Sequence, residues 1–186
     1  MNKAIIGVVA ASFAAAGTAN AQIVIDIIDS GGNVEATLSG SIDLAATQGY
    51  IADSTGYDGF LDSLGAISFT GNNTNFYGID VGTWTPFGST GNFFNWDSSY
   101  GNGFAMFSDP VLGVPAGYQS GDALSGGGTM FGTSIAALGM DEGSWVTTLT
   151  GPSGVVDTVT VNIGIPAPGT AALLGLGGLA ATRRRR

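Results

Sequence analysis

A strict two-residue alternation of polar and apolar side chains constrains the fold of this chain more than any other feature. The even positions carry Val34, Ala36, Leu38, Gly40, Ile42 and Leu44, and the odd positions carry Glu35, Thr37, Ser39, Ser41 and Asp43. Residues 158 to 163 alternate in the same way. Because successive side chains of a strand point to opposite faces, both segments are expected to be strands with one buried face and one wet face.

Short β-rich runs separated by turn clusters extend this pattern along the chain. Further strands are expected at residues 23–28, 66–70, 76–81, 103–107, 129–135 and 144–150. Turns are expected at residues 30–33, 71–74, 117–128, 141–143 and 151–154, where glycine, asparagine, proline and serine gather. The last turn joins two strands as a hairpin, and residues 134–138 are the one internal helical candidate, of a single turn. The pattern predicts an all-β fold, an antiparallel β-sandwich of jelly-roll type.

The N-terminus has the three parts of a secretory signal peptide. Lys3 precedes an apolar run over residues 4–16, and a small-residue segment with Ala19 and Ala21 follows. This order predicts a signal helix over residues 1–21 and cleavage between Ala21 and Gln22. A retained membrane anchor is the competing interpretation, against which the short apolar run and the small-residue exit both argue.

The C-terminus has three parts of its own. Residues 166–169 contain Pro166, Pro168 and Gly169, residues 170–182 are apolar, and the chain ends in Arg183, Arg184, Arg185 and Arg186. This order resembles the PEP-CTERM sorting signal, whose members are substrates of the membrane protease exosortase. The glutamate that usually stands between the two prolines is Ala167 here. The resemblance covers residues 166–186 and implies an address, not an activity.

The physical properties of the tail agree with that address. A helix over its thirteen apolar residues is about 20 Å long, at 1.5 Å per residue. A bilayer core of roughly 30 Å needs about twenty residues, so the tail suits a transient inner-membrane anchor better than a permanent span. Four terminal arginines favour the cytoplasmic side and place the preceding chain outside. The expected partners are the secretion machinery and exosortase, and the expected destination is the cell surface or extracellular matrix.

Both signals leave residues 22–165 as one passenger domain of extreme charge. All five Lys and Arg residues lie outside it and all fourteen Asp and Glu residues lie inside it, so its net charge is −14. Without a basic footprint, nucleic acid is not expected as a partner. Residues 112–125 and 133–145 resemble a passenger domain of PEP-CTERM proteins from planctomycete-like bacteria, which implies a β domain and no chemistry.

Most catalytic constellations are excluded by composition. The chain has no His and no Cys, which removes Ser-His-Asp triads, cysteine nucleophiles and zinc sites built on these ligands. The passenger has no lysine for Schiff-base chemistry. A pair of carboxylates of glycosidase type is the remaining enzymatic alternative, and we expect a protein without catalytic activity and without a cofactor.

Two weaker patterns suggest ligands. Asp53, Asp58 and Asp62 stand in a Gly-containing segment whose oxygens suit Ca²⁺, although the spacing is not that of an EF-hand and a structural loop explains the segment better. Residues 71–104 hold nine of the eighteen aromatic residues. There Phe93, Phe94, Trp96 and Tyr100 are candidates for a polysaccharide-binding surface, with packing in the core as the alternative. The sequence therefore predicts an exported surface or matrix protein, or alternatively a lectin-like carbohydrate-binding module, with or without calcium.

Overall fold

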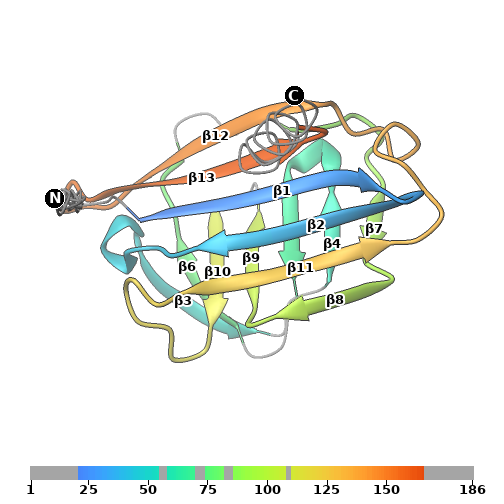
Figure 1. The fold of residues 1–186 in the computed structure, drawn as a ribbon. Helices are drawn as coiled ribbons and strands as arrows, with labels where there is room; N and C mark the ends of the chain where they lie inside the picture. Colours follow the sequence, from blue (N-terminus) through green and yellow to red (C-terminus); the bar gives the residue numbers. More distant parts are fainter. Residues whose placement is uncertain (1–20, 55–57, 70–73, 82–85, 108–109, 166–186) are drawn as a thin grey trace, which may run out of the picture.

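The computed structural model describes residues 21–54, 58–69, 74–81, 86–107 and 110–165. Within these residues the chain forms two β-sheets and two short 3₁₀ turns, and the strands of one sheet run crosswise behind those of the other (Figure 1). The strands are β1 Gln22–Ser30, β2 Asn33–Gly40, β3 Gly49–Ser54, β4 Gly59–Leu61, β5 Ala66–Phe69, β6 Thr74–Gly78, β7 Phe93–Asn95, β8 Ser98–Gly101, β9 Phe104–Phe107, β10 Val111–Pro115, β11 Leu124–Met130, β12 Gly143–Thr150 and β13 Val156–Ile163. The 3₁₀ turns are η1 Leu44–Ala46 and η2 Asp62–Leu64.

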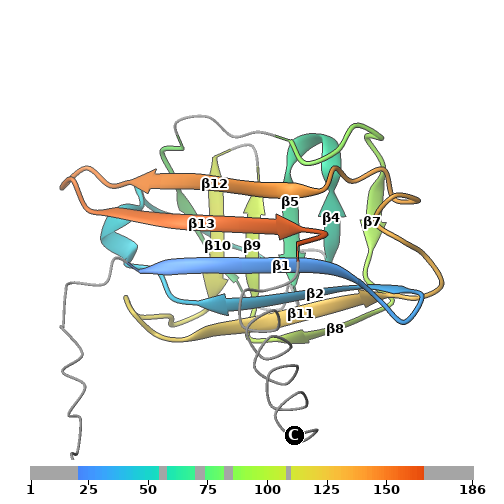
Figure 2. The same cartoon turned by 45° about the horizontal axis from the view of Figure 1, so that its top comes forward.

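Sheet A has the order β12-β13-β1-β2-β11-β8, and Figure 2 shows its long strands lying side by side. Most of its pairs are antiparallel, but β1 and β13 run parallel, with Gln22 opposite Thr158 and Ile27 opposite Ile163. The prediction of an antiparallel sandwich is therefore wrong at this pair. The reason is topological: β13 follows β12 through a tight hairpin and reaches β1 from the far end of the chain, so no short turn dictates an antiparallel approach.

Sheet B has the order β3-β6-β10-β9-β5-β4-β7. Its pairs are antiparallel, and the register of β3 against β6 shifts by one residue between Tyr50 and Ala52. These strands are short. The chain passes from sheet A to sheet B after β2 and returns after β7 and after β10, so each sheet is assembled from distant parts of the sequence (Figure 1).

The core lies between the two sheets and follows from the alternation in sheet A. Ile23, Ile25 and Ile27 of β1 are fully buried, and the inward positions of β2 and β13 are filled in the same way. Sheet B contributes aromatic and aliphatic side chains from β4, β5, β9 and β10 to the same core. The largest of these fully buried side chains are Phe60, Phe69, Phe104, Ile67, Met106 and Leu112.

The hairpin predicted around residues 151–154 is confirmed, and the turn predicted at residues 30–33 also joins a hairpin in sheet A. Ser30 pairs with Asn33 across Gly31 and Gly32, both with positive φ, as a two-residue hairpin turn between right-twisted strands requires. Thr150 pairs with Val156 at the end of the β12–β13 hairpin. The alternation at residues 34–44 does not continue as one strand: β2 ends at Gly40, and Asp43 caps η1.

The prediction of a turn over residues 117–128 is wrong in its second half. Gly126, Gly127 and Gly128 belong to β11, between β2 and β8. A Cβ at Gly128 would overlap the indole of Trp96, and one at Gly127 would overlap the ring of Tyr100. These glycines therefore give a strand on which two aromatic rings lie against the backbone, one on each face.

Several predictions fall on residues outside the described part of the chain. These are the signal segment up to residue 20 with Ala19, the sorting signal with Pro166, Pro168 and Gly169, and the arginines 183–186. Among the residues that the structure does describe, no helix has the length and apolar character needed to cross a membrane. Residues 134–138 contain one hydrogen bond of helical type, from Leu138 N to Ser134 O, within a run of turns.

Candidate functional site

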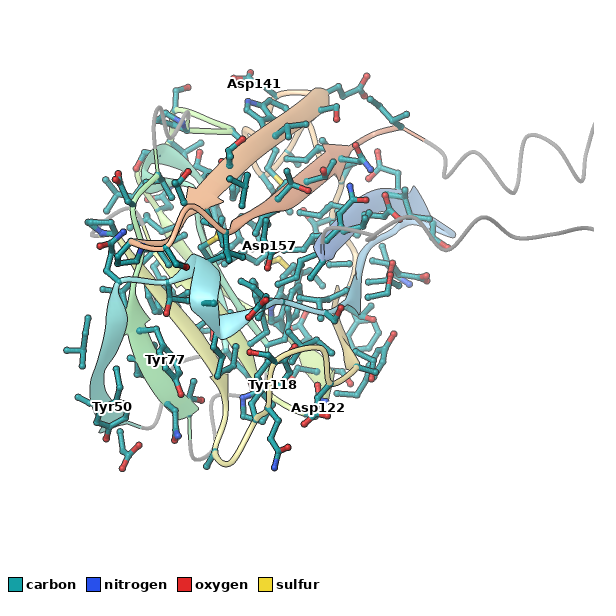
Figure 3. The ribbon with its side chains drawn as sticks, turned by 90° about the vertical axis from the view of Figure 1, so that its left-hand side faces the viewer. Tyr50, Tyr77, Tyr118, Asp122, Asp141 and Asp157 are labelled. Carbon is teal, nitrogen blue, oxygen red and sulfur yellow. The ribbon has the colours of Figure 1, made fainter. Side chains whose placement is uncertain are left out.

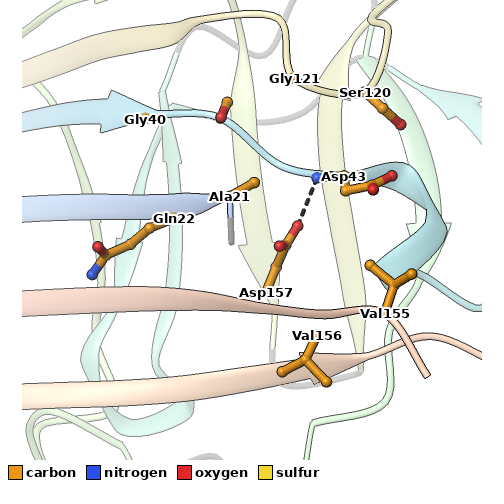
Figure 4. A pocket seen from close by; sticks show the side chains of 10 residues that line it. Ala21, Gln22, Gly40, Asp43, Ser120, Gly121, Val155, Val156 and Asp157 are labelled. Atoms are coloured by element: carbon orange, nitrogen blue, oxygen red, sulfur yellow. Dashed lines mark hydrogen bonds between the residues drawn. The ribbon is translucent and has the colours of Figure 1, made fainter. Parts of the chain in front are cut away.

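A cavity of about 430 Å³ opens at the end of the sandwich where β1 and β13 begin (Figure 4). Its wall comes from four separate parts of the sequence: the start of β1, the loop after β2, the β10–β11 loop and the start of β13. The lining residues are Ala21, Gln22, Gly40, Ser41, Asp43, Ser120, Gly121, Val155, Val156 and Asp157. The parallel pairing of β1 with β13 creates this place, because it brings both strand starts to the same end of the sheet.

Asp157 is the buried charge of this cavity. It occupies an inward position of β13, in line with Val159, Val161 and Ile163, and only 2 % of its surface is exposed. Its Oδ2 accepts a hydrogen bond of 2.6 Å from the backbone N–H of Asp43 (Figure 4), and the backbone N–H of Ala21 also donates to the carboxylate. The side chain therefore ties the start of β1 to the loop after β2.

Burial raises the pKa of Asp157 above its ordinary value. The N–H groups of Asp43 and Ala21 act against this shift, and the nearby charge of Asp43 adds to it. A raised pKa in the folded state means that folding favours the protonated carboxyl. This contribution to stability is present below the unfolded pKa and is lost as the pH rises through the folded value.

The loop next to Asp157 is fixed by its own caps. Asp43 Oδ1 accepts a 2.9 Å hydrogen bond from Ala45 N at the start of η1, and Ser120 Oγ accepts one of 2.9 Å from Leu44 N. Tyr118 holds the same loop from the β10–β11 side: its hydroxyl accepts from Ile42 N, and its single proton can be donated to Asp122 O at 2.8 Å or Ile42 O at 3.1 Å. Tyr118 and Asp122 lie side by side near the lower edge of Figure 3, with Asp157 above them.

The main chemical group of this cavity is the buried Asp157 carboxylate, which accepts from backbone N–H groups. Burial raises the pKa of the Tyr118 hydroxyl, so this group stays neutral and serves as a structural hydrogen-bonding partner. Residues 22–165 carry no Lys, Arg or His, so no side chain of the passenger can pair with Asp157 as a cation. A carboxylate in this setting can hold a cationic group, but the cavity offers no nucleophile activated by a neighbouring base.

The three aspartates predicted as calcium ligands do not come together. Asp62 is fully buried, and its carboxylate accepts hydrogen bonds from Thr90 N at 2.8 Å and Thr90 Oγ1 at 3.1 Å. Asp58 accepts from Ser99 Oγ at 2.8 Å, and Asp53 accepts from the Tyr50 hydroxyl. Within the described residues no three His, Cys, Asp or Glu side chains are grouped as metal ligands would be.

The four aromatic candidates for glycan binding separate into two kinds. Trp96 is buried, its Nε1 donates to Ser68 O at 2.9 Å, and its ring stacks on Phe69 with centroids 5.5 Å apart. It presents no free face to a sugar, so its assignment to a binding surface is wrong. Phe94 is half-buried and stacks on Phe60 at 5.0 Å. Phe93 and Tyr100 are 42 % and 58 % exposed.

Two of the three predicted cleavage residues lie at the cavity, and the sequence alone does not connect them with an acidic residue. Ala21 and Gln22 line it, beside Asp157. A signal for Asp157 was present, because an aspartate at residue 157 stands on the apolar face of a strand whose other inward residues are Val159, Val161 and Ile163. The sequence gives no signal for the roles of Asp43 and Tyr118 at this cavity, because their contacts join loops that are far apart in the chain.

Comparison with protein-family models, with curated proteins and with solved structures found no match, so the function of this all-β chain is argued from its own geometry.

Proposed function

We propose that this chain is an exported, non-catalytic protein of the cell surface or extracellular matrix. Signal peptidase would remove residues 1–21, exosortase would process the chain near residues 166–169, and the passenger would act as a structural component of the matrix. Its fold would be of jelly-roll type, a proposal supported by the passages of the chain between two packed sheets.

The observation that carries the proposal is the position of the fold within the chain. The first strand begins at Gln22, the first residue after the expected cleavage point, and the last strand ends at Ile163, three residues before Pro166. Thus every strand of both sheets lies between the two expected cuts, within the described residues. A passenger with these limits keeps its sheets intact when either signal is removed.

The separation of charge supports the same interpretation. Lys3 and the terminal arginines lie in the expected signals, where basic residues set membrane orientation. The passenger between them is purely acidic. A domain of net −14 is soluble through self-repulsion and suited to an environment rich in divalent cations.

Intact-mass analysis and N-terminal sequencing of the protein recovered from the surface of an exporting, exosortase-containing cell test this function. The expected product begins at Gln22 and lacks Arg183 to Arg186. As a matched control, Ala19→Arg removes the small residue that the cut requires and should leave the leader attached. A surface product that retains the four arginines contradicts the proposal.

A carbohydrate-binding surface is the second candidate, and the setting of Tyr100 favours it. The ring lies against the backbone of Gly127 on the outer face of sheet A, 58 % exposed. Flat exposed rings of this kind can stack on sugar faces. If this surface binds, Tyr100→Ala should lower retention on the matrix polysaccharide of the producing cell, while Phe131→Ala, an equally exposed ring elsewhere, should not. Equal retention of both variants and the parent protein removes this candidate.

A further inference from the structure

The buried carboxylate of Asp157 is held by backbone groups alone. Its two donors are the N–H groups of Asp43 and Ala21, and no side-chain cation exists anywhere in residues 22–165. Burying a carboxylate is costly unless a charge of opposite sign accompanies it. The passenger can gain one cation without any change of sequence, namely the α-ammonium group that forms when its leader is cut off.

The expected cut falls beside this carboxylate. Ala21 N already donates to Asp157, and the nitrogen of Gln22 follows one residue later, at most about 3.6 Å along an extended chain. Gln22 is held in place from both sides, because Ser41 N donates to Gln22 O at 3.1 Å and Gln22 stands opposite Thr158 in the parallel pair. A new terminus at Gln22 is therefore held at the cavity that Asp157 also lines, and a rotation of the freed nitrogen toward the carboxylate would complete an ion pair.

Removal of Ala21 also makes the room that the pair needs. Ala21 lines the cavity between the start of β1 and the Asp157 side chain (Figure 4). Its departure removes one hydrogen bond to the carboxylate and enlarges a cavity of about 430 Å³. We propose that cleavage between Ala21 and Gln22 creates an α-ammonium group that takes the place of the Ala21 N–H and forms an ion pair with Asp157. This inference rests on the processing proposed above.

The other titratable groups around this point are acids, so none of them competes with the ammonium group, as a cation, for Asp157. They are Asp43 on the loop after β2, whose charge acts on Asp157, and Tyr118 and Asp122 on the β10–β11 loop, where both Asp122 and Asp157 act on Tyr118. Before cleavage, the neighbouring acid opposes ionisation of Asp157. After cleavage, the ammonium group favours the ionised carboxylate, and the carboxylate favours the charged amine. Processing would thus turn a buried unpaired anion into a paired one and fasten β1 to β13.

The sign of the pH dependence follows from this pair. The pKa of the α-amine would rise above its ordinary range of about 7.7–8.0. The stability that the amine contributes is then complete below the unfolded pKa and is lost as the pH rises through the folded pKa.

The composition of the passenger makes a direct test practical. After cleavage the α-amine is the protein's one amine, because Lys3 leaves with the leader. Reductive methylation of the processed protein with ¹³C-formaldehyde then labels a single site, which keeps its charge and titrates in an NMR experiment. The folded parent protein should show an amine pKa higher by about one unit or more than Asp157→Asn. Asp141→Asn, which removes an exposed charge at another corner of the molecule (Figure 3), should titrate like the parent.

Three results would overturn the inference, and they are distinguishable. An N-terminus other than Gln22, found by sequencing before the titration, would overturn both the processing and the pair. Cyclisation of Gln22 with loss of ammonia, seen by intact mass, would leave no amine and overturn the pair alone. Equal amine pKa values in the folded parent and Asp157→Asn would do the same. If Asp157→Asn does not fold, the parent is titrated with and without urea, where equal values in both states refute the pair.

Discussion

Sheet A and sheet B bury their strands differently. The long strands β1, β2, β12 and β13 have eight or nine residues, and most of their positions alternate between buried and more exposed. In sheet B, β5 is buried at all four positions and β9 at three of four. Sheet A thus has one wet face, whereas the central strands of sheet B are covered on both faces. Alternating polarity along the sequence identifies strands with one exposed face, but it gives no signal for strands that are buried on both faces.

The first way to sharpen this comparison is to remove the ring that joins the sheets. Trp96 donates to Ser68 O in β5 and lies against Gly128 in β11, so it belongs to both. Trp96→Ala should lower the free energy of unfolding by about 3 to 5 kcal/mol. Chemical denaturation measures this. Tyr100→Ala, on the outer face, is the control and should change stability by less than about 1 kcal/mol. Similar losses for both variants would contradict the buried position of the indole.

A smaller loss of stability is expected at Gly128 of β11, where the Trp96 ring lies against the backbone. Gly128→Ala places a methyl group against the Trp96 indole and should destabilise by about 1 to 3 kcal/mol through overpacking. Ser125→Ala is the matched control, an exposed position on the same strand. In the background of Trp96→Ala, the cost of Gly128→Ala should largely disappear, and a double-mutant cycle tests this coupling. Additive losses would show that the glycine serves another purpose.

Polarity on the inward face of sheet A gives a third test. Val161 is buried in β13 opposite Trp145 and Ile25. Val161→Thr keeps the shape and adds a hydroxyl to the core, which should cost about 1 to 3 kcal/mol. Thr148→Val makes the reverse change at an exposed position of β12 and should stay within about 0.5 kcal/mol. Thermal unfolding of both variants distinguishes the faces, and equal effects would mean that the alternation carries no energetic weight.

The reverse change, the removal of a buried hydroxyl, should have the opposite sign in sheet B. Ser68 is fully buried in β5, and its Oγ has no hydrogen-bond partner among the residues that the structure describes. Ser68→Ala removes a desolvated hydroxyl and should leave stability unchanged or raise it by up to about 1 kcal/mol. A clear loss of stability in denaturant titration would mean that the hydroxyl is bonded after all.

The sequence predicts the fold where local signals are complete. Both hairpins of sheet A follow from glycine-containing turns between alternating residues, so β1, β2, β12 and β13 could be placed within a few residues. Strands such as Gly59–Leu61 and Phe93–Asn95 were missed, because three residues are too short to show a period. From the sequence, the glycines of β11 predict a turn. Their actual role is to leave room for the rings of Trp96 and Tyr100, which lie far from them in the chain.

The candidate site was less predictable than the fold for a related reason. Asp157 could have been noticed as a charge on an apolar strand face, but its partners Asp43 and Ala21 lie more than a hundred residues away. The aromatic cluster was noticed, yet composition could not separate Trp96, which has a hydrogen-bond acceptor in the core, from Tyr100, which lies outside. In both cases the missing information is the pairing of the sheets.

The parallel pairing of β1 with β13 also sets the order in which the molecule can be completed. β1 emerges first during synthesis, and it pairs with β2 at once through a two-residue turn. Its other edge, with Ile25 destined for Val161, has no partner until the last strand has been made. Contacts of such sequence separation make folding slow, because a long loop must close before they form. A chain of this design stays open at its centre until nearly its whole length is available, as the export proposed above would require of a chain that folds after crossing a membrane.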